Sequence, residues 1–368
     1  MSLLLRKDRR VAGAHHWPLI LAALAVLAIG LTNLFSAAYA TRPTYFFAQL
    51  AWTGLGLVAA AAVYAIDYRI YERLAFVFYA VVLVLLAAVL FTRPIAGSQR
   101  WITLGPANLQ PSELMKLGIV LVLAKHFHDL TVVPAGYSLW ELRKALLLTV
   151  APVALILLEP DLGTAGLIGL VGGTILLFVK IRPRTLLALV LVGLILLPVG
   201  WFFVLKDYQK QRIETLFDPD SDPRGTGYHR RQSIIAVGSG QVFGKGFMGG
   251  TQTQLRFLPE QHTDFIFSVY AEERGFIGSF TLIMLYAALI LSGIHISSKA
   301  REKFGALIVL GATAILFWQA WINIAMVAGI FPVVGVTLPL MSYGGTSLLV
   351  TLCCIALMLN VYARRHLF

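Results

Sequence analysis

Apolar stretches of about twenty residues recur along this chain and leave few alternatives for its fold. A helix needs about 20 apolar residues to cross a bilayer core, and a helix satisfies its own backbone hydrogen bonds in lipid. Only 13% of the residues are charged, whereas a soluble domain carries about a quarter. We therefore expect an all-α, polytopic membrane bundle of about ten transmembrane helices. The predicted spans are 17–37, 45–65, 73–91, 113–127, 144–158, 160–180, 185–205, 265–293, 305–328 and 344–362.

The charges between the spans predict how the bundle lies in the membrane. With the N-terminus inside, most arginines and lysines fall in inner segments, and the short outer loops hold only Arg42, Arg93 and Arg100. Because basic residues concentrate in cytoplasmic loops, we expect both termini in the cytoplasm. Residues 1–368 would form one membrane domain, with residues 206–264 as a large extracytoplasmic loop between the seventh and eighth spans. The net charge of +12 is spread around helix ends, which suits anionic membrane lipids and not nucleic acid.

Asp264 is the most informative polar residue, because it lies where the loop 206–264 runs into an apolar span. A carboxylate at the mouth of a membrane helix is costly to keep ionised without partners or water, so it is a functional candidate. Aspartate is also a favoured N-cap residue of helices. The residues alone leave both interpretations open.

Glu113 and Lys116 lie at the start of the fourth span, three positions apart. This spacing puts both side chains on one helix face, and an unpaired charge entering a membrane span is expensive. We therefore expect an ion pair. It either holds the fold alone or positions a substrate group.

Three further segments carry polar chemistry between spans. The turn Glu159-Pro160-Asp161 favours a structural role, in which Asp161 helps to cap the following helix. Arg100, followed by Trp101, either anchors the chain at the membrane interface or recognises an anionic phosphate. The glycine-rich segment 335–347 either lines a cavity or forms a re-entrant turn buried in protein.

Some kinds of chemistry are absent from the sequence. It contains no P-loop, no GxSxG motif and no Cys/His spacing typical of a metal site. We therefore expect no ATP hydrolysis and no dedicated metal cage.

Several motifs, taken in order over nearly the whole chain, resemble those of the SEDS family of polytopic membrane proteins (shape, elongation, division and sporulation). The matching strings are Arg100-Trp101-Ile102, Gln110-Pro111-Ser112-Glu113 with Lys116, Glu159 to Thr164, Pro259 to Phe267, and Leu338 to Ser347. Within the family, Gly249-Gly250-Thr251-Gln252 and Gly335 to Leu340 favour the elongation branch. The division branch, which would carry the same chemistry, is the nearest alternative.

The resemblance implies a peptidoglycan glycosyltransferase in the bacterial cytoplasmic (inner) membrane, with its active site on the extracytoplasmic face. Its substrate would be lipid II, a disaccharide-pentapeptide on undecaprenyl pyrophosphate, and its product a linear glycan strand. Its partner would be a class B penicillin-binding protein, which is a transpeptidase. No cofactor follows from the residues, although a divalent cation, Mg or Mn, could bridge the pyrophosphate oxygens.

The resemblance also implies roles for individual residues. The family position that matches Asp264 is regarded as catalytic, so we predict that Asp264 is the general base of an inverting displacement. Glu113 and Lys116 match a functionally important charge pair. The candidates for stabilising the departing pyrophosphate are Arg100, Lys116 and Arg256. The other candidates for substrate binding or support are Glu260, His262, Ser342 and Tyr343, with Glu159 and Asp161 as structural or supporting residues.

Two other classes of function are compatible with a polytopic chain. A lipid II flippase would need a polar path through the bundle with charges in both halves, whereas here the polar residues crowd the outer side. A non-catalytic scaffold for a transpeptidase would need the spans but not the carboxylate of Asp264.

Overall fold

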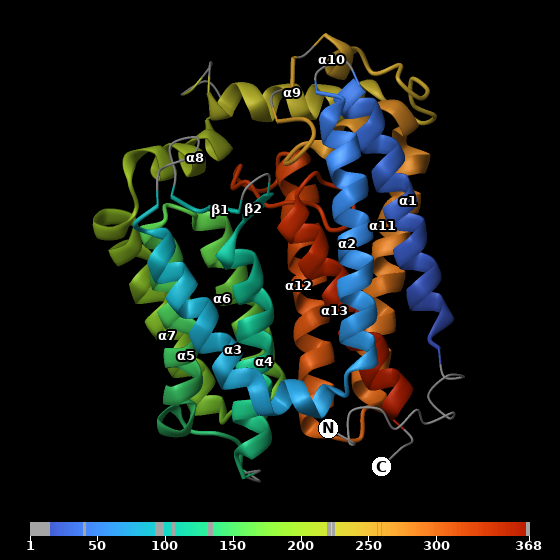
Figure 1. The fold of residues 1–368 in the computed structure, drawn as a ribbon. Coiled ribbons are helices and arrows are strands. Elements are labelled where there is room, and N and C mark those ends of the chain that lie inside the picture. Colours follow the sequence, from blue (N-terminus) through green and yellow to red (C-terminus); the bar gives the residue numbers. More distant parts are fainter. Residues whose placement is uncertain are drawn as a thin grey trace.

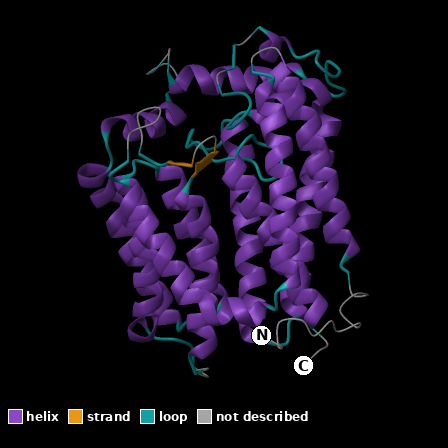
Figure 2. Cartoon of the chain, in the orientation of Figure 1, coloured by secondary structure: helices purple, strands orange, loops and turns teal. Residues whose placement is uncertain are grey.

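Ten long helices make up most of the part of the chain that the computed structural model describes, and Figures 1 and 2 show them packed side by side. The described residues are 15–39, 42–92, 99–104, 107–131, 135–218, 222, 225–255, 257–258 and 260–365. The long helices are α1 (Trp17–Tyr39), α2 (Thr44–Ala65), α3 (Tyr68–Val89), α4 (Pro111–Asp129), α5 (Leu139–Leu158), α6 (Leu162–Phe178), α7 (Pro183–Val199), α11 (Ile266–Lys299), α12 (Lys303–Val327) and α13 (Gly345–Arg364). Each overlaps one predicted span, which confirms the all-α, multi-pass prediction.

Seven of the helices in the described part of the chain are long and apolar enough to cross a membrane by length and composition: α1, α2, α3, α7, α11, α12 and α13. The other three are helped by their neighbours. Helix α6 is apolar but has 17 residues, and α4 and α5 carry charged residues. Helix α4 is buried over most of its length between α3, α6 and α12. Its charges are therefore shielded from lipid by protein.

The centre of the bundle is built from α4, α12 and α13, most of whose residues are buried. Helix α2 packs along α13, and α1 packs along α11. The outer helices expose large apolar side chains, most of all α7. In a membrane protein this apolar surface is covered by acyl chains instead of water.

The two ends of the bundle differ. Helix α1 begins and α13 ends at one end, which we call the inner end, as Figure 1 shows. The opposite, outer end is covered by α8 (Asp207–Phe217), α9 (Thr226–Ser239) and α10 (Thr251–Gln254). A hairpin of β1 (Ile102–Leu104) and β2 (Ala107–Leu109) also lies there, with Ile102 opposite Leu109. These short elements were not predicted, because they lie in polar, turn-rich segments, and among them α8 carries only a short 3.6-residue pattern.

Helix α11 differs from the predicted span 265–293. Gly275 has φ 64° and ψ −160°, so the helix is interrupted after its first nine residues. The loop after α9 packs into the break. Gln241 O in that loop accepts a hydrogen bond from Phe276 N of α11 at 2.8 Å. A β-carbon at Gly275 would lie 2.3 Å from Gly244 N, so only glycine fits here. The continuous membrane helix therefore starts after Gly275, and Asp264 lies farther from it than predicted.

Candidate active site

Asp264 lies in a turn, residues 261–265, that is fixed from two sides. The side-chain amide of Asn323 on α12 donates to Asp264 O at 2.9 Å. The hydroxyl of Ser342, which precedes α13, donates to Thr263 O at 2.6 Å. Helix α12 and the segment before α13 therefore set the position of the Asp264 backbone.

Asp264 does not cap α11. The N-cap position belongs to Phe265, and no side chain makes a capping hydrogen bond there. The interpretation of Asp264 as an N-cap is therefore wrong for this structure. The half-buried carboxylate has no ion-pair partner among the described residues, so it is available for chemistry.

The surroundings of Asp264 raise its basicity. Burial raises the pKa of its carboxyl to about 6, and the Glu260 carboxylate adds to the rise. Arg212 on α8 acts in the opposite direction, while Asp161 acts in the same direction as Glu260. At neutral pH Asp264 is mostly ionised, yet it holds a proton more readily than an ordinary aspartate, which suits a general base.

The glycine-rich segment 335–347 forms a re-entrant turn that is buried in protein at residues 338–342, whereas Gly335 near its start is exposed next to Asp264. The Ser342 hydroxyl accepts from Leu338 N at 2.8 Å while it donates to Thr263 O. Gln49 on α2 donates to Ser342 O at 3.1 Å and accepts from Gly344 N at 3.2 Å. Ser342 is therefore committed to holding the turn.

Aromatic side chains gather next to that turn. The rings of Tyr343 and Tyr45 stack with centroids 4.4 Å apart, and the His262 ring lies 4.7 Å from Tyr45. His262 Nε2 lies 3.6 Å from a carboxylate oxygen of Glu260, whose side chain is 63% exposed. Burial lowers the pKa of His262, so it is neutral at pH 7. The predicted residues Glu260 and His262 thus lie in the chain just before Asp264, and Tyr343 reaches the same turn because its N donates to His262 O at 2.9 Å.

Arg100 clamps the turn between α5 and α6. Its guanidinium donates to Glu159 O at 3.2 Å and to Pro160 O, and it lies 3.7 Å from the Asp161 carboxylate. Asp161 in turn accepts from Thr164 N at 3.1 Å, which confirms that Asp161 caps α6. Arg100 is therefore engaged in contacts with this turn.

Glu159 is the most enclosed acidic residue of this end. Its side chain has no exposed surface, and neither carboxyl oxygen has a hydrogen-bond partner among the described residues. Burial raises the pKa of Glu159 to about 8, and the nearby Asp161 adds to the rise. Glu159 is consequently protonated at neutral pH.

Glu113 and Lys116 form the predicted ion pair on α4, with Lys116 Nζ 2.5 Å from Glu113 Oε2. The side chains are 9% and 1% exposed. Lys116 is therefore enclosed and paired. Arg256, another predicted cation, lies outside the described residues.

Comparison with known proteins identifies the family. A family model described as cell cycle protein, covering FtsW, RodA and SpoVE, matches residues 16–367. The chain belongs to this family. The SEDS resemblance seen in the sequence is thereby confirmed. The peptidoglycan glycosyltransferase MrdB of Escherichia coli K12 is 42% identical over 85% of this chain and 84% of its own length. Stage V sporulation protein E of Bacillus subtilis is 35% identical over 93% and 95%.

Solved structures of similar proteins share the fold of this FtsW/RodA/SpoVE family member. A chain in a peptidoglycan synthase complex that coordinates polymerisation and crosslinking matches with a TM-score of 0.83 and 33% identity, over 96% of this chain and 99% of that one. The rod shape determining protein RodA of Thermus thermophilus matches with a TM-score of 0.71 and 30% identity, over 96% and 98%.

Arg212 is a residue near the site that the sequence did not single out. It lies over the ring of Tyr208, 5.9 Å from the centroid, and the Tyr208 hydroxyl donates to Pro160 O at 3.3 Å. Helix α8 is thereby docked on the turn that Arg100 clamps, and Arg212 acts on the pKa of Asp264. Among the described residues Arg212 has no carboxylate within ion-pair distance. The signal in the sequence that could have pointed to this helix is the 3.6-residue spacing of apolar side chains over residues 207–217.

Glu272 and Glu273 were also missed, because they were counted within an apolar span. Glu272 is fully buried and accepts from Lys245 Nζ at 2.6 Å and from Gln252 N at 3.1 Å. Glu273 accepts from the Ser36 hydroxyl on α1. Both carboxylates lie just before Gly275, so they tie the loop 240–252 and α1 to the break in α11.

Proposed function

We propose that Asp264 is the general base with which this protein polymerises lipid II into glycan strands during cell elongation. Membership of the family and the similarity to MrdB support a peptidoglycan glycosyltransferase, and the similarity to the rod shape determining protein RodA supports the elongation type. The observation that supports the role of Asp264 is its half-buried, unpaired carboxylate with a pKa of about 6. Two polar side chains hold its turn in place, one from α12 and one from the segment before α13.

The reaction is a single displacement. The 4-hydroxyl oxygen of the acceptor GlcNAc attacks the anomeric carbon of the donor MurNAc, and its proton passes to Asp264. The bond between that carbon and the pyrophosphate oxygen breaks, so undecaprenyl pyrophosphate leaves as an anion and the α linkage becomes a β-1,4 bond. A positioned base contributes about 10²–10⁴-fold to such a rate. Because the leaving group is already anionic, no general acid is required.

Cations are expected to stabilise the negative charge on the departing undecaprenyl pyrophosphate. Arg212 is the first candidate, because its charge lowers the pKa of Asp264 and it has no carboxylate partner among the described residues. Arg100 supports it by fixing the turn on which α8 rests. Arg256 remains a candidate, and Lys116 is assigned a supporting role because it is enclosed. Fixed cations in a site with little water stabilise developing charge strongly. A divalent cation, Mg or Mn, would supply further positive charge for the departing pyrophosphate.

The outer end of the bundle is proposed to face the extracytoplasmic side of the bacterial inner membrane, with both termini in the cytoplasm. The concentration of basic residues at the inner helix ends supports this orientation. A class B penicillin-binding protein is the proposed partner. The similar chain in a synthase complex that coordinates polymerisation and crosslinking supports that choice.

The test is glycan polymerisation from purified lipid II in detergent, with a class B penicillin-binding protein present. We expect polymer from the unmodified protein and from Asp207→Asn, a control that removes an exposed carboxylate on α8. We expect none from Asp264→Asn. Equal polymer from all three would assign the base elsewhere. No polymer from the unmodified protein, together with lipid II translocation in liposomes, would favour the flippase alternative.

A further inference from the structure

We propose that the inner end of the bundle holds a binding site for the phosphate headgroup of an anionic phospholipid. The site is a cavity of about 290 Å³ between the inner ends of α6, α11 and α12. Lys180 follows α6, and Lys303 begins α12. The two lysines line the cavity together with the hydroxyl-bearing side chains of Tyr137 and Ser297. The site is far along the bundle from Asp264 and has no part in the displacement.

The rim of the cavity is built by backbone pairing between two loops. Tyr137 N donates to Lys180 O at 2.8 Å, and Arg182 N donates to Tyr137 O at 3.1 Å. Lys303 Nζ donates to the Tyr137 hydroxyl at 3.1 Å. This contact holds the ammonium at the cavity. The tyrosine hydroxyl accepts from Lys303 and donates to Thr131 O at 3.3 Å, so the tyrosine is fixed in place and positions the ammonium for an anion.

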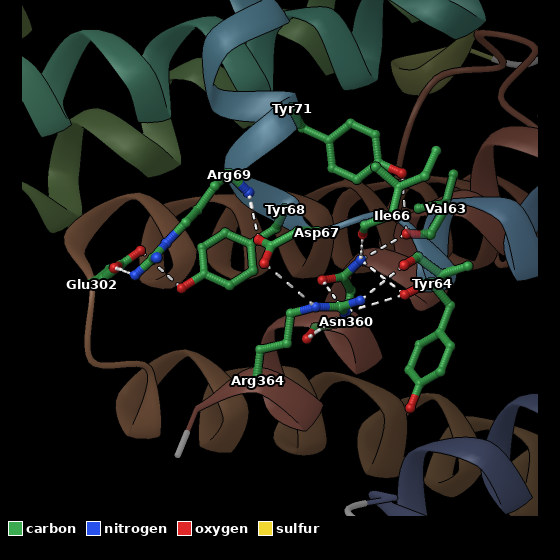
Figure 3. A network of polar contacts seen from close by, with 11 residues as sticks. Val63, Tyr64, Ile66, Asp67, Tyr68, Arg69, Tyr71, Glu302, Asn360 and Arg364 are labelled. Carbon is green, nitrogen blue, oxygen red and sulfur yellow. Dashed lines mark hydrogen bonds and ion pairs between the residues drawn. The ribbon is translucent and has the colours of Figure 1, made fainter. Parts of the chain in front are cut away.

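The charges of Lys180 and Lys303 are unmatched, unlike those of Arg69 and Arg364 at the same end. Figure 3 shows Arg69 paired with Glu302, and Arg364 bonded to Tyr64 O at 3.1 Å and close to Asp67. Neither lysine of the cavity has a carboxylate within ion-pair distance among the described residues. Two ammonium groups without an acidic partner favour an anion between them.

The surroundings identify the anion as a lipid. Below the lysines the cavity is lined by apolar side chains, among them Leu307 and Leu310 of α12. Phe178, the last residue of α6, lines it as well and is 66% exposed. A phosphodiester at the helix ends would therefore have its acyl chains along an apolar surface. A zwitterionic headgroup carries its own ammonium, which the two lysines repel, so we expect selectivity for anionic headgroups.

The experiment is native mass spectrometry of the full chain in detergent with equal amounts of phosphatidylglycerol and phosphatidylcholine of the same acyl chains. We expect the protein to retain phosphatidylglycerol preferentially. Lys180→Gln/Lys303→Gln should lower this retention roughly tenfold or more. Lys180→Arg/Lys303→Arg should keep it, because the charge remains. The control Lys144→Gln/Lys299→Gln removes the same charge from exposed inner positions outside the cavity and should leave retention unchanged.

Several outcomes would overturn the proposal. These are equal retention of both lipids by the unmodified protein, unchanged retention in the glutamine pair, and an equal loss in the control pair, which would indicate bulk charge. Displacement of the lipid by millimolar glycerol phosphate would show that the site takes a free phosphate instead. Lipid II polymerisation by each variant reports folding independently, since no lysine of the cavity touches the proposed active site.

Discussion

The backbone of Gly335 lies against the carboxylate of Asp264, so close that a β-carbon on Gly335 would be 3.3 Å from Asp264 Oδ2. Gly335 also has a positive φ of 72°, which residues with a β-carbon adopt at a cost of about 1–2 kcal/mol. The re-entrant segment thus forms one wall of the site. It approaches the carboxylate only because the residue there is glycine.

Gly335→Ala is therefore expected to reduce polymerisation by tenfold or more, since small displacements at a reacting group are costly, on the order of 10²-fold for 1 Å. The measurement is the initial rate of polymer formation from lipid II, with thermal stability recorded in parallel. Gly166→Ala is the matched control, because a β-carbon on this exposed residue of α6 meets nothing within 4 Å. Equal rates for the two variants would contradict the close approach.

The pKa of Asp264 predicts the pH dependence of the reaction. The base must be ionised, and burial raises the pKa of its carboxyl from 3.8 to about 6. The polymerisation rate should therefore fall as pH drops through about 6, and not near 4. The measurement is the rate between pH 4.5 and 8 under saturating lipid II. An acidic limb near pH 4 would show that an ordinary carboxylate, or none, is the base.

Arg212 should influence both the rate and that pH profile. Arg212→Gln removes a cation near the leaving group, so we expect kcat to fall roughly 10²-fold with a smaller change in KM. Because Arg212 lowers the pKa of Asp264, its removal should also move the acidic limb to higher pH. Lys210→Gln, on the same helix, is the control with the same charge change and should do neither. A lower rate without a shift of the limb would place Arg212 away from Asp264.

Much of the fold follows from the sequence because lipid imposes a simple rule. Every long apolar run became a helix, since a backbone in lipid has to bond to itself. The exception is α11, where Gly275 and the loop carrying Gln241 break the helix. The sequence alone does not reveal which loop will pack into a break, because that depends on tertiary packing.

The site was predictable in its acidic residues and less so in its supports. Asp264, Glu113 and Asp161 stand out because charges beside apolar spans are expensive. Arg212 could not be ranked without knowing that α8 folds back onto the turn at Pro160. Asn323 is likewise an inconspicuous amide in an apolar helix until the structure shows it bonded to Asp264 O.

Glu159→Gln should increase stability, and the gain should grow with pH. Burial raises the pKa of Glu159 from 4.5 to about 8, so the folded protein holds a proton that the unfolded chain releases. The stability contributed by this residue is complete below pH 4.5 and is lost as pH rises toward 8. Glutamine has no proton to release, so the variant should gain thermal stability relative to the unmodified protein between pH 5 and 8. A difference in Tm that stays constant with pH would show that Glu159 is ionised in the folded state.

The pair Glu113–Lys116 allows its structural and functional roles to be separated. Removing one partner leaves a charge in a site only 1–9% exposed, so Glu113→Gln and Lys116→Met should each destabilise by about 3–5 kcal/mol. Replacing both removes the unpaired charge, so Glu113→Gln/Lys116→Met should recover most of the stability.

The activity of that double variant decides between the two roles. Thermal unfolding in detergent measures the recovery, and polymerisation is then compared at equal folded fraction. Activity that returns with stability would make the pair a structural one. Activity that stays at least tenfold low in a stable double variant would show that the pair positions a group needed for the reaction. We expect the second result, because Gln110 at the start of the same helix contacts Asp161, and Asp161 acts on Asp264.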